Sequence, residues 1–91
     1  MSIEEIIDKY INNAHQVFKQ IGERREKDDA ARILEHAERY LDDALYYRSQ
    51  KRFETALASV AYCEGLLDAL RLLGMVEFQW STENGAKEER Q

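Results

Sequence analysis

The sequence contains no proline, only four glycines and a single cysteine. Without proline and with few glycines, a fold of many short strands and tight turns is excluded, and long uninterrupted helices are favoured. One cysteine, Cys63, excludes an internal disulfide and a zinc site built from cysteine pairs. No apolar run approaches the roughly 20 residues that a membrane-spanning helix needs, so we expect no membrane association.

Basic residues are also in short supply. The chain has 13 Lys and Arg against 18 Asp and Glu, which gives a net charge of −5. A nucleic-acid partner requires clustered positive charge, and the one basic cluster, within residues 23–29, is interleaved with Glu and Asp. We therefore expect no nucleic-acid binding. The acidic, amphipathic start has no basic region followed by an apolar region, which predicts no signal peptide and a cytoplasmic location.

Apolar residues recur at the helical period in the first half of the chain. Ser2 and Glu5 form a capping-box pattern ahead of such a stretch, which predicts a helix over about 3–21, with Gly22 as its C-terminal cap. After a charged segment the same period returns over about 28–49. Asp28 or Asp29 is expected to cap this second helix, since a carboxylate there meets free backbone N–H groups.

A third helix is predicted over about 53–73, ending before Gly74. The polar residues Ser49–Arg52 suit a tight turn between two antiparallel helices. The expected fold is all-α, an up-down-up three-helix bundle with a central antiparallel αα-hairpin, forming one domain over 1–80. Val76, Phe78 and Trp80 are expected to pack back across the bundle or onto a partner, and the polar stretch 81–91 to be disordered.

A resemblance to a known family is carried by residues of the second and third helices. The matching residues are Tyr40-Leu41-Asp42-Asp43-Ala44, Tyr46-Tyr47, Ala56-Leu57, Ala61-Tyr62, Glu64-Gly65, Leu67-Asp68-Ala69 and Leu73-Gly74. With these motifs, the segment 37–78 resembles the archaeal helical family catalogued as domain of unknown function 357. Leu66 stands where that family often has tryptophan. The resemblance implies a small all-α, cytoplasmic, archaeal domain, with no catalytic residue or cofactor to carry over.

Glu64, Asp68 and Arg71 share one stripe of the third helix. One interpretation is a carboxylate pair that binds a metal or a cationic ligand; the other is an ion pair of Arg71 with Asp68 or Glu64, joined by Arg48. Same-helix ion pairs are common, and two carboxylates fall short of a metal shell, so the ion pair is favoured. No catalytic, cofactor-binding or metal-binding residue is predicted, and Cys63 is expected in the core.

The third helix is apolar over a wider arc than two neighbouring helices cover, which predicts a further partner. Gly65 is the expected point of close approach, because a glycine inside a helix is usually kept for packing. The candidate interface residues are Tyr46, Tyr62, Leu66, Leu70, Leu73, Phe78 and Trp80. The leading functional hypothesis is a non-enzymatic protein-interaction or assembly module that forms a homodimer or binds another protein. The alternative is a small-ligand or nucleotide-associated accessory domain, with Glu64, Asp68, Arg71 and Tyr62 lining a cleft.

Overall fold

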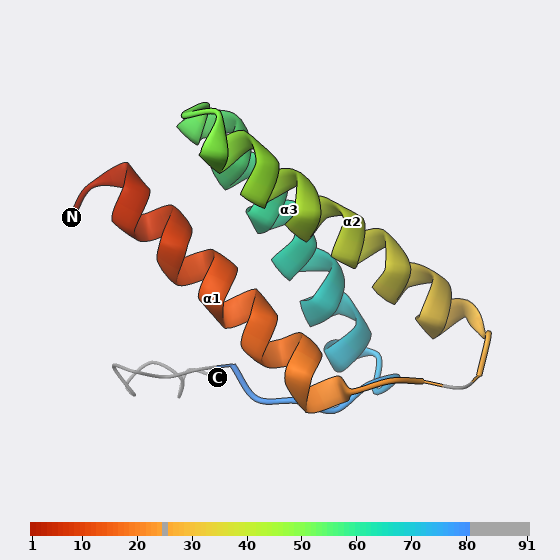
Figure 1. The fold of residues 1–91 in the computed structure, drawn as a ribbon. Coiled ribbons are helices and arrows are strands. Elements are labelled where there is room, and N and C mark those ends of the chain that lie inside the picture. The colour runs from red at the N-terminus through yellow and green to blue at the C-terminus, as the bar shows by residue number, and fades with distance from the viewer. Residues whose placement is uncertain (25, 81–91) are drawn as a thin grey trace.

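A computed structural model describes residues 1–24 and 26–80. These residues form three helices, α1 (Ile3–Ile21), α2 (Asp29–Ser49) and α3 (Phe53–Leu72), which run up, down and up (Figure 1). The predicted all-α three-helix bundle is confirmed, and each helix boundary lies within one residue of its predicted position. The prediction for 81–91 lies outside the described residues.

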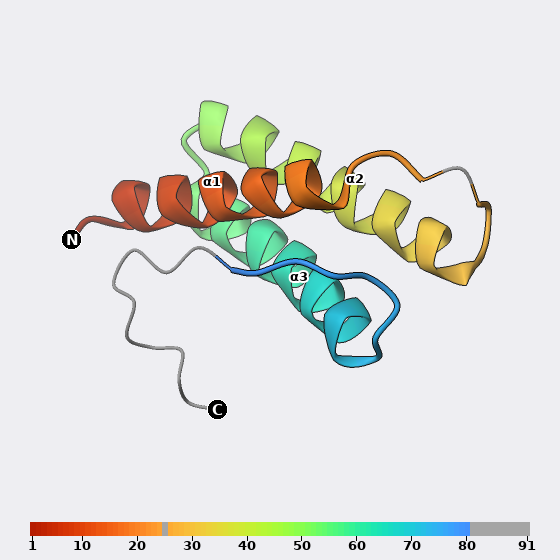
Figure 2. The same ribbon diagram turned by 90° about the horizontal axis from the view of Figure 1, so that it is seen from below.

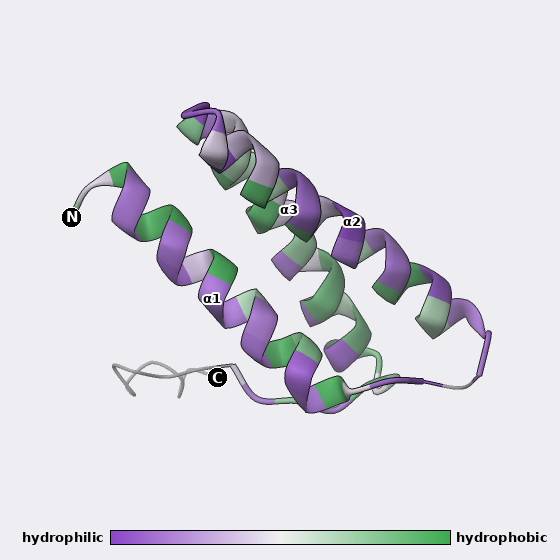
Figure 3. Cartoon of the chain, viewed as in Figure 1, coloured by the Kyte–Doolittle hydropathy of each residue, from purple (hydrophilic) through white to green (hydrophobic). Residues whose placement is uncertain are grey.

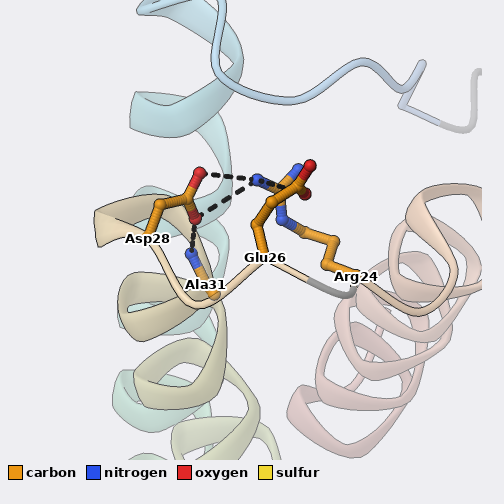
Figure 4. Close-up of polar contacts among 4 residues, drawn as sticks. All are labelled: Arg24, Glu26, Asp28 and Ala31. Atoms are coloured by element: carbon orange, nitrogen blue, oxygen red, sulfur yellow. Dashed lines mark hydrogen bonds and ion pairs between the residues drawn. The ribbon is translucent and has the colours of Figure 1, made fainter.

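The helix starts follow from side-chain capping. In α1, the Glu5 N–H donates to Ser2 Oγ at 3.1 Å and the Ser2 N–H donates to Glu5 Oε1 at 3.0 Å, which completes the predicted capping box. In α2 the cap is Asp28, whose Oδ1 accepts from the Ala31 N–H at 3.0 Å (Figure 4). Arg24 Nη2 donates to the same carboxylate at 3.0 Å, so the loop before α2 is tied to its first turn.

Helices α2 and α3 end in the same backbone motif. After α3, Gly74 adopts φ +76° and the Met75 N–H donates to the Leu70 carbonyl at 2.9 Å. After α2, the corresponding left-handed residue is Lys51, with φ +63°, and the Arg52 N–H donates to the Tyr47 carbonyl at 2.9 Å. These are Schellman-type ends, which reverse the chain within three residues. They produce the tight αα-hairpin and the sharp exit from α3.

The hairpin of α2 and α3 is the most extensively packed pair, and α1 lies against α3 with fewer contacts to α2 (Figures 1 and 2). Hydrophilic and hydrophobic residues alternate along α1, as expected of a helix with one face in the core (Figure 3). Cys63 is fully buried, as predicted, and burial raises the pKa of its thiol to about 12. The helical core consists of Ile7, Ile11, Ala14, Val17, Ala30, Leu34, Ala37, Leu41, Ala44, Ala56, Val60, Cys63, Leu67 and Leu70.

Residues 75–80, here called the strap, turn back from the end of α3 and run along the α1 and α3 side of the bundle (Figure 2). Val76 and Phe78 are buried, with 6% and 8% of their surface exposed, and Trp80 packs partly buried against the same core. The prediction that these three alternate residues pack onto the bundle is therefore confirmed. The strap gives α3 a third covering element besides α1 and α2.

Candidate functional site

Asp68 and Arg71 form the favoured ion pair of the predicted stripe. Arg71 donates to Asp68 Oδ1 through Nη2 at 3.0 Å and through Nε at 3.2 Å. The same oxygen accepts from the Trp80 indole Nε1 at 3.1 Å. This carboxylate therefore fastens the strap to α3.

Arg48 does not join this stripe, contrary to expectation. Its guanidinium instead binds Asp8 of α1 through two bonds, Nε to Oδ1 at 2.7 Å and Nη2 to Oδ2 at 3.0 Å. These bonds from Arg48 hold the pKa of the Asp8 carboxyl below its usual value. A bidentate pair of this kind fixes the register between α1 and the end of α2. The sequence gives no sign of this ion pair, because Asp8 and Arg48 are 40 positions apart and meet only once the helices have packed.

Glu64 lies one turn before Asp68 and makes no hydrogen bond or ion pair with any residue of the described chain. Burial, with a smaller contribution from the charge of Asp68, raises the pKa of its carboxyl to about 7. Within residues 1–24 and 26–80, no three His, Cys, Asp or Glu side chains come together in a group that could hold a metal ion. The stripe thus contains one structural ion pair and one carboxyl whose pKa burial raises to about 7.

Two further hydrogen bonds, which the sequence pattern did not predict, attach the strap to α1. Gln20 Nε2 donates to the Gln79 carbonyl at 2.8 Å, and the Gln79 N–H donates to Gln20 Oε1 at 2.9 Å. One side-chain amide thereby satisfies both backbone groups of a strap residue, as a neighbouring strand would. Gln20 stands among the polar residues of α1, where nothing distinguishes it from other surface amides.

Tyr62 lies on the opposite side of α3 from the stripe. Its ring contacts Tyr40 of α2 at a centroid distance of 4.5 Å, and His36 lies 6.4 Å away in the same aromatic group. At 100° per residue, Asp68 points about 120° away from Tyr62 around the helix, and Arg71 points about 180° away. The cleft predicted from Glu64, Asp68, Arg71 and Tyr62 is therefore not formed as a single site.

The predicted interface residues divide into a covered and an exposed group. Leu70 is fully buried and Phe78 is 8% exposed, so both belong to the chain's own core and are withdrawn from the predicted interface. Trp80 is partly buried by the strap's packing. Tyr62 is 49% exposed and Leu73 is 71% exposed, whereas Leu66 is partly buried against the core. The exposed group lies at helical spacing along one side of α3.

Gly65 does not have the packing role expected of it. A Cβ atom built at this position meets no atom within 4 Å, apart from the helix's own backbone and chain neighbours. Neither α1 nor α2 approaches α3 at this point. A small side chain at residue 65 is thus explained by no contact within the described chain.

A shallow depression lies beside Leu66, with a volume of about 560 Å³. Its lining joins α2 to the exposed side of α3 and consists of Asp29, Arg32, Ile33, Glu35, His36, Arg39 and Leu66. We call the surface formed by this depression together with Tyr40, Tyr62 and Leu73 the outer face of the hairpin. It combines exposed apolar and aromatic side chains with charges of both signs, the composition of many protein–protein interfaces.

A second hollow, of about 460 Å³, lies between the end of α1 and the start of α2. Phe18, Ile21 and Leu34 contribute apolar surface to it, and Arg24 and Lys27 contribute positive charge. Arg24 Nε is buried there without a hydrogen-bond partner in the described chain. The Arg24 guanidinium already donates to Asp28, the N-cap of α2 (Figure 4). The positive charge of Arg24 in this hollow therefore serves the helix cap.

Comparison with known families gives one match. The family model described as "Protein of unknown function (DUF357)" matches residues 9–76. This range is wider than the segment 37–78 that carried the resemblance, and it includes most of α1. No curated protein and no solved structure gives a significant match. Among the described residues, no helix is both long and apolar enough to cross a membrane.

Proposed function

This chain belongs to the family described as protein of unknown function DUF357, and we propose that it is a non-enzymatic protein-interaction module that associates with itself. The observation that carries this proposal is the exposure of large apolar side chains on one side of α3 and at its C-terminal end: Tyr62 is 49% exposed and Leu73 is 71% exposed. An exposed apolar patch at helical spacing is the usual mark of an interaction surface.

The covered side of α3 strengthens the proposal. The chain uses its own strap to bury Val76 and Phe78, yet leaves Tyr62 and Leu73 in water. Apolar surface that is not covered within a monomer stabilises association when a partner covers it, by about 25 cal/mol for each Å² removed from water. A dimer through this surface accounts for the apolar arc that two neighbouring helices leave open.

The ligand-binding alternative requires Glu64, Asp68, Arg71 and Tyr62 to line one cleft, and the geometry of α3 does not favour this. Tyr62 is on one side of α3 and the stripe of Glu64, Asp68 and Arg71 is on the other, with Asp68 already bound to Arg71 and Trp80. No constellation among residues 1–24 and 26–80 supports an enzymatic role, because the Cys63 thiol near Glu64 is fully buried and has a raised pKa, and Asp68 is bound to Arg71 and Trp80. We place the module in the cytoplasm of an archaeon, as the resemblance of its sequence implies.

Sedimentation equilibrium over low to high micromolar concentrations tests self-association. We expect a reversible monomer–dimer equilibrium, and a clean monomer across the whole range would refute the proposal. A thermal-shift screen with nucleotides and divalent cations is the companion experiment. We expect no stabilisation, because binding to the folded state would raise the melting temperature.

A further inference from the structure

We propose that two copies of the chain exchange their straps, so that the strap of each copy packs against α1 and α3 of the partner subunit. This inference rests on the proposed self-association and adds the segment that each copy contributes to it. The two copies meet at the C-terminal ends of α3, and Gly74 is the hinge. The contacts of the strap, the backbone conformation of Gly74 and the exposed residues beside it lead to this arrangement.

The strap is held in the way that a bound peptide is held. Trp80 donates to Asp68 at 3.1 Å, and the Gln20 amide makes two hydrogen bonds with the backbone of Gln79, at 2.8 and 2.9 Å. In the part of the chain that the structure describes, no backbone–backbone hydrogen bond joins residues 76–80 to a helix. Extended peptides bind grooves in this manner, through alternate side chains and a few contacts to the main chain. The surface under the strap is therefore a binding surface for this sequence, whichever copy supplies it.

The closed position of the strap depends on one reversal of the chain. Gly74 adopts a left-handed conformation with φ +76°, and the Met75 N–H donates to the Leu70 carbonyl at 2.9 Å. When this reversal opens, the strap continues away from its own α3, and its contacts are restored only on a second copy. Exchange of an identical element in this way is a low-cost route to a dimer, because the same contacts form in both states.

The residues beside the hinge favour the exchanged state. A strap joined to its own helix closes at an effective concentration in the millimolar range, so exchange requires surface that only the dimer covers. Leu73 and Met75 flank Gly74 and are 71% and 39% exposed. In the exchanged dimer both hinges lie at the two-fold axis, where each copy's Leu73 and Met75 meet those of the partner subunit. Removing this apolar surface from water stabilises the dimer.

Gly74→Ala in the full chain tests the exchange. The left-handed conformation is unfavourable for alanine, so the change strains the closed monomer, whereas the opened hinge of the exchanged dimer has no such strain. We expect the Kd, measured by sedimentation equilibrium, to fall about tenfold or more, because each dimer relieves the strain at two hinges. A substitution that destabilises the monomer would thus strengthen association.

Gly22→Ala is the matched control. Gly22 also has a positive φ, +72°, at the end of α1, and a Cβ atom at either glycine meets no atom within 4 Å apart from its chain neighbours. Both changes therefore act through the backbone, but only Gly74 lies at the hinge, so Gly22→Ala should leave the Kd within about twofold. Dimers whose Kd Gly74→Ala leaves unchanged or raises overturn the exchange while leaving self-association in place. A parent chain that is monomeric at every concentration overturns the proposed function itself.

Isotope-filtered NMR on the parent dimer identifies which copy supplies each strap. The dimer is prepared from one isotope-labelled copy and one unlabelled copy. Because Gln20 Nε2 lies 2.8 Å from the Gln79 carbonyl oxygen, we expect nuclear Overhauser effects between Gln20 of the labelled copy and Gln79 of the unlabelled copy. If these contacts occur only within one copy, the straps are closed in the dimer and the exchange is refuted.

Discussion

The two sides of α3 carry similar apolar residues but meet different surroundings. On the side of α1, the strap covers the helix and is held by two hydrogen bonds between Gln20 and Gln79 and by one that the Trp80 indole N–H donates to Asp68. On the side of Tyr62 and Leu73, the helix is covered only in part, by Tyr40 of α2, and Tyr62 and Leu73 remain 49% and 71% exposed. The difference indicates that the covered side stabilises the monomer, whereas the open side is the surface that the proposed self-association would bury.

The largest effect is expected from Phe78→Ala in the strap. Phe78 is 8% exposed and stacks edge-on against Trp80 at a centroid distance of 5.0 Å. Its removal leaves a cavity and releases the strap, so we expect a loss of about 3–4 kcal/mol in the free energy of unfolding, measured by urea denaturation. A loss below about 1 kcal/mol would show that the strap contributes little to the stability of the monomer. The covered side of α3 would then differ little from the open side.

The next effect concerns Glu64, a partly buried carboxyl on the covered side of α3. The pKa of Glu64 is raised from 4.5 to about 7, so the folded chain retains a proton that the unfolded chain has already released. Stability should therefore fall as pH rises from about 4.5 through about 7. Glu64→Gln removes this loss, and because water screens a partly buried carboxyl, we expect it to add about 1–2 kcal/mol at pH 8.

At pH 4 the Glu64→Gln variant and the parent should unfold at nearly the same urea concentration, because Glu64 is then protonated in both states. Glu77→Gln, on the exposed side of the strap, is the matched control and should retain the pH dependence of the parent. If Glu64→Gln were instead destabilising at pH 8, Glu64 would have a favourable partner that the geometry does not include.

The fold was largely predictable from the sequence because its determinants are local. The capping box of Ser2 and Glu5, the left-handed glycine at residue 74 and the helical period each act within a few residues. The alternation of Val76, Phe78 and Trp80 predicted one shared apolar face, since three residues two apart point the same way, but it left open whether that face packs on the bundle or on a partner.

The hydrogen bonds and ion pairs that join distant elements could not be predicted. The pairs Gln20–Gln79 and Asp8–Arg48 depend on which surface residues the packed helices bring together, and the local sequence around them is ordinary. The sequence predicts Leu70 at the interface because this residue lies within the wide apolar arc of the third helix. Only the placement of α1 and the strap shows which part of that arc is already covered.

A smaller effect is expected where the strap is fastened to α3. Trp80→Phe keeps an aromatic ring but removes the indole N–H that donates to Asp68 at 3.1 Å. Asp68 retains its two bonds from Arg71, so only one hydrogen bond is lost, and we expect a cost of about 1 kcal/mol. A double-mutant cycle with Asp68→Ala measures the coupling, and a coupling near zero would mean that this bond does not hold the strap.

The smallest effect on stability, and the sharpest test of the open side, comes from two adjacent leucines at the end of α3. Leu72 and Leu73 are 72% and 71% exposed, yet they point about 100° apart around the helix, and only Leu73 shares the side of Tyr62 and Leu66. Replacing either by serine should change the free energy of unfolding of the monomer by less than about 0.5 kcal/mol, because neither is buried. Leu73→Ser should nevertheless raise the Kd of the dimer about tenfold, since each copy loses an apolar side chain at the interface, whereas Leu72→Ser should leave it unchanged. Equal effects of the two changes would mean that association depends on general hydrophobicity rather than on the outer face.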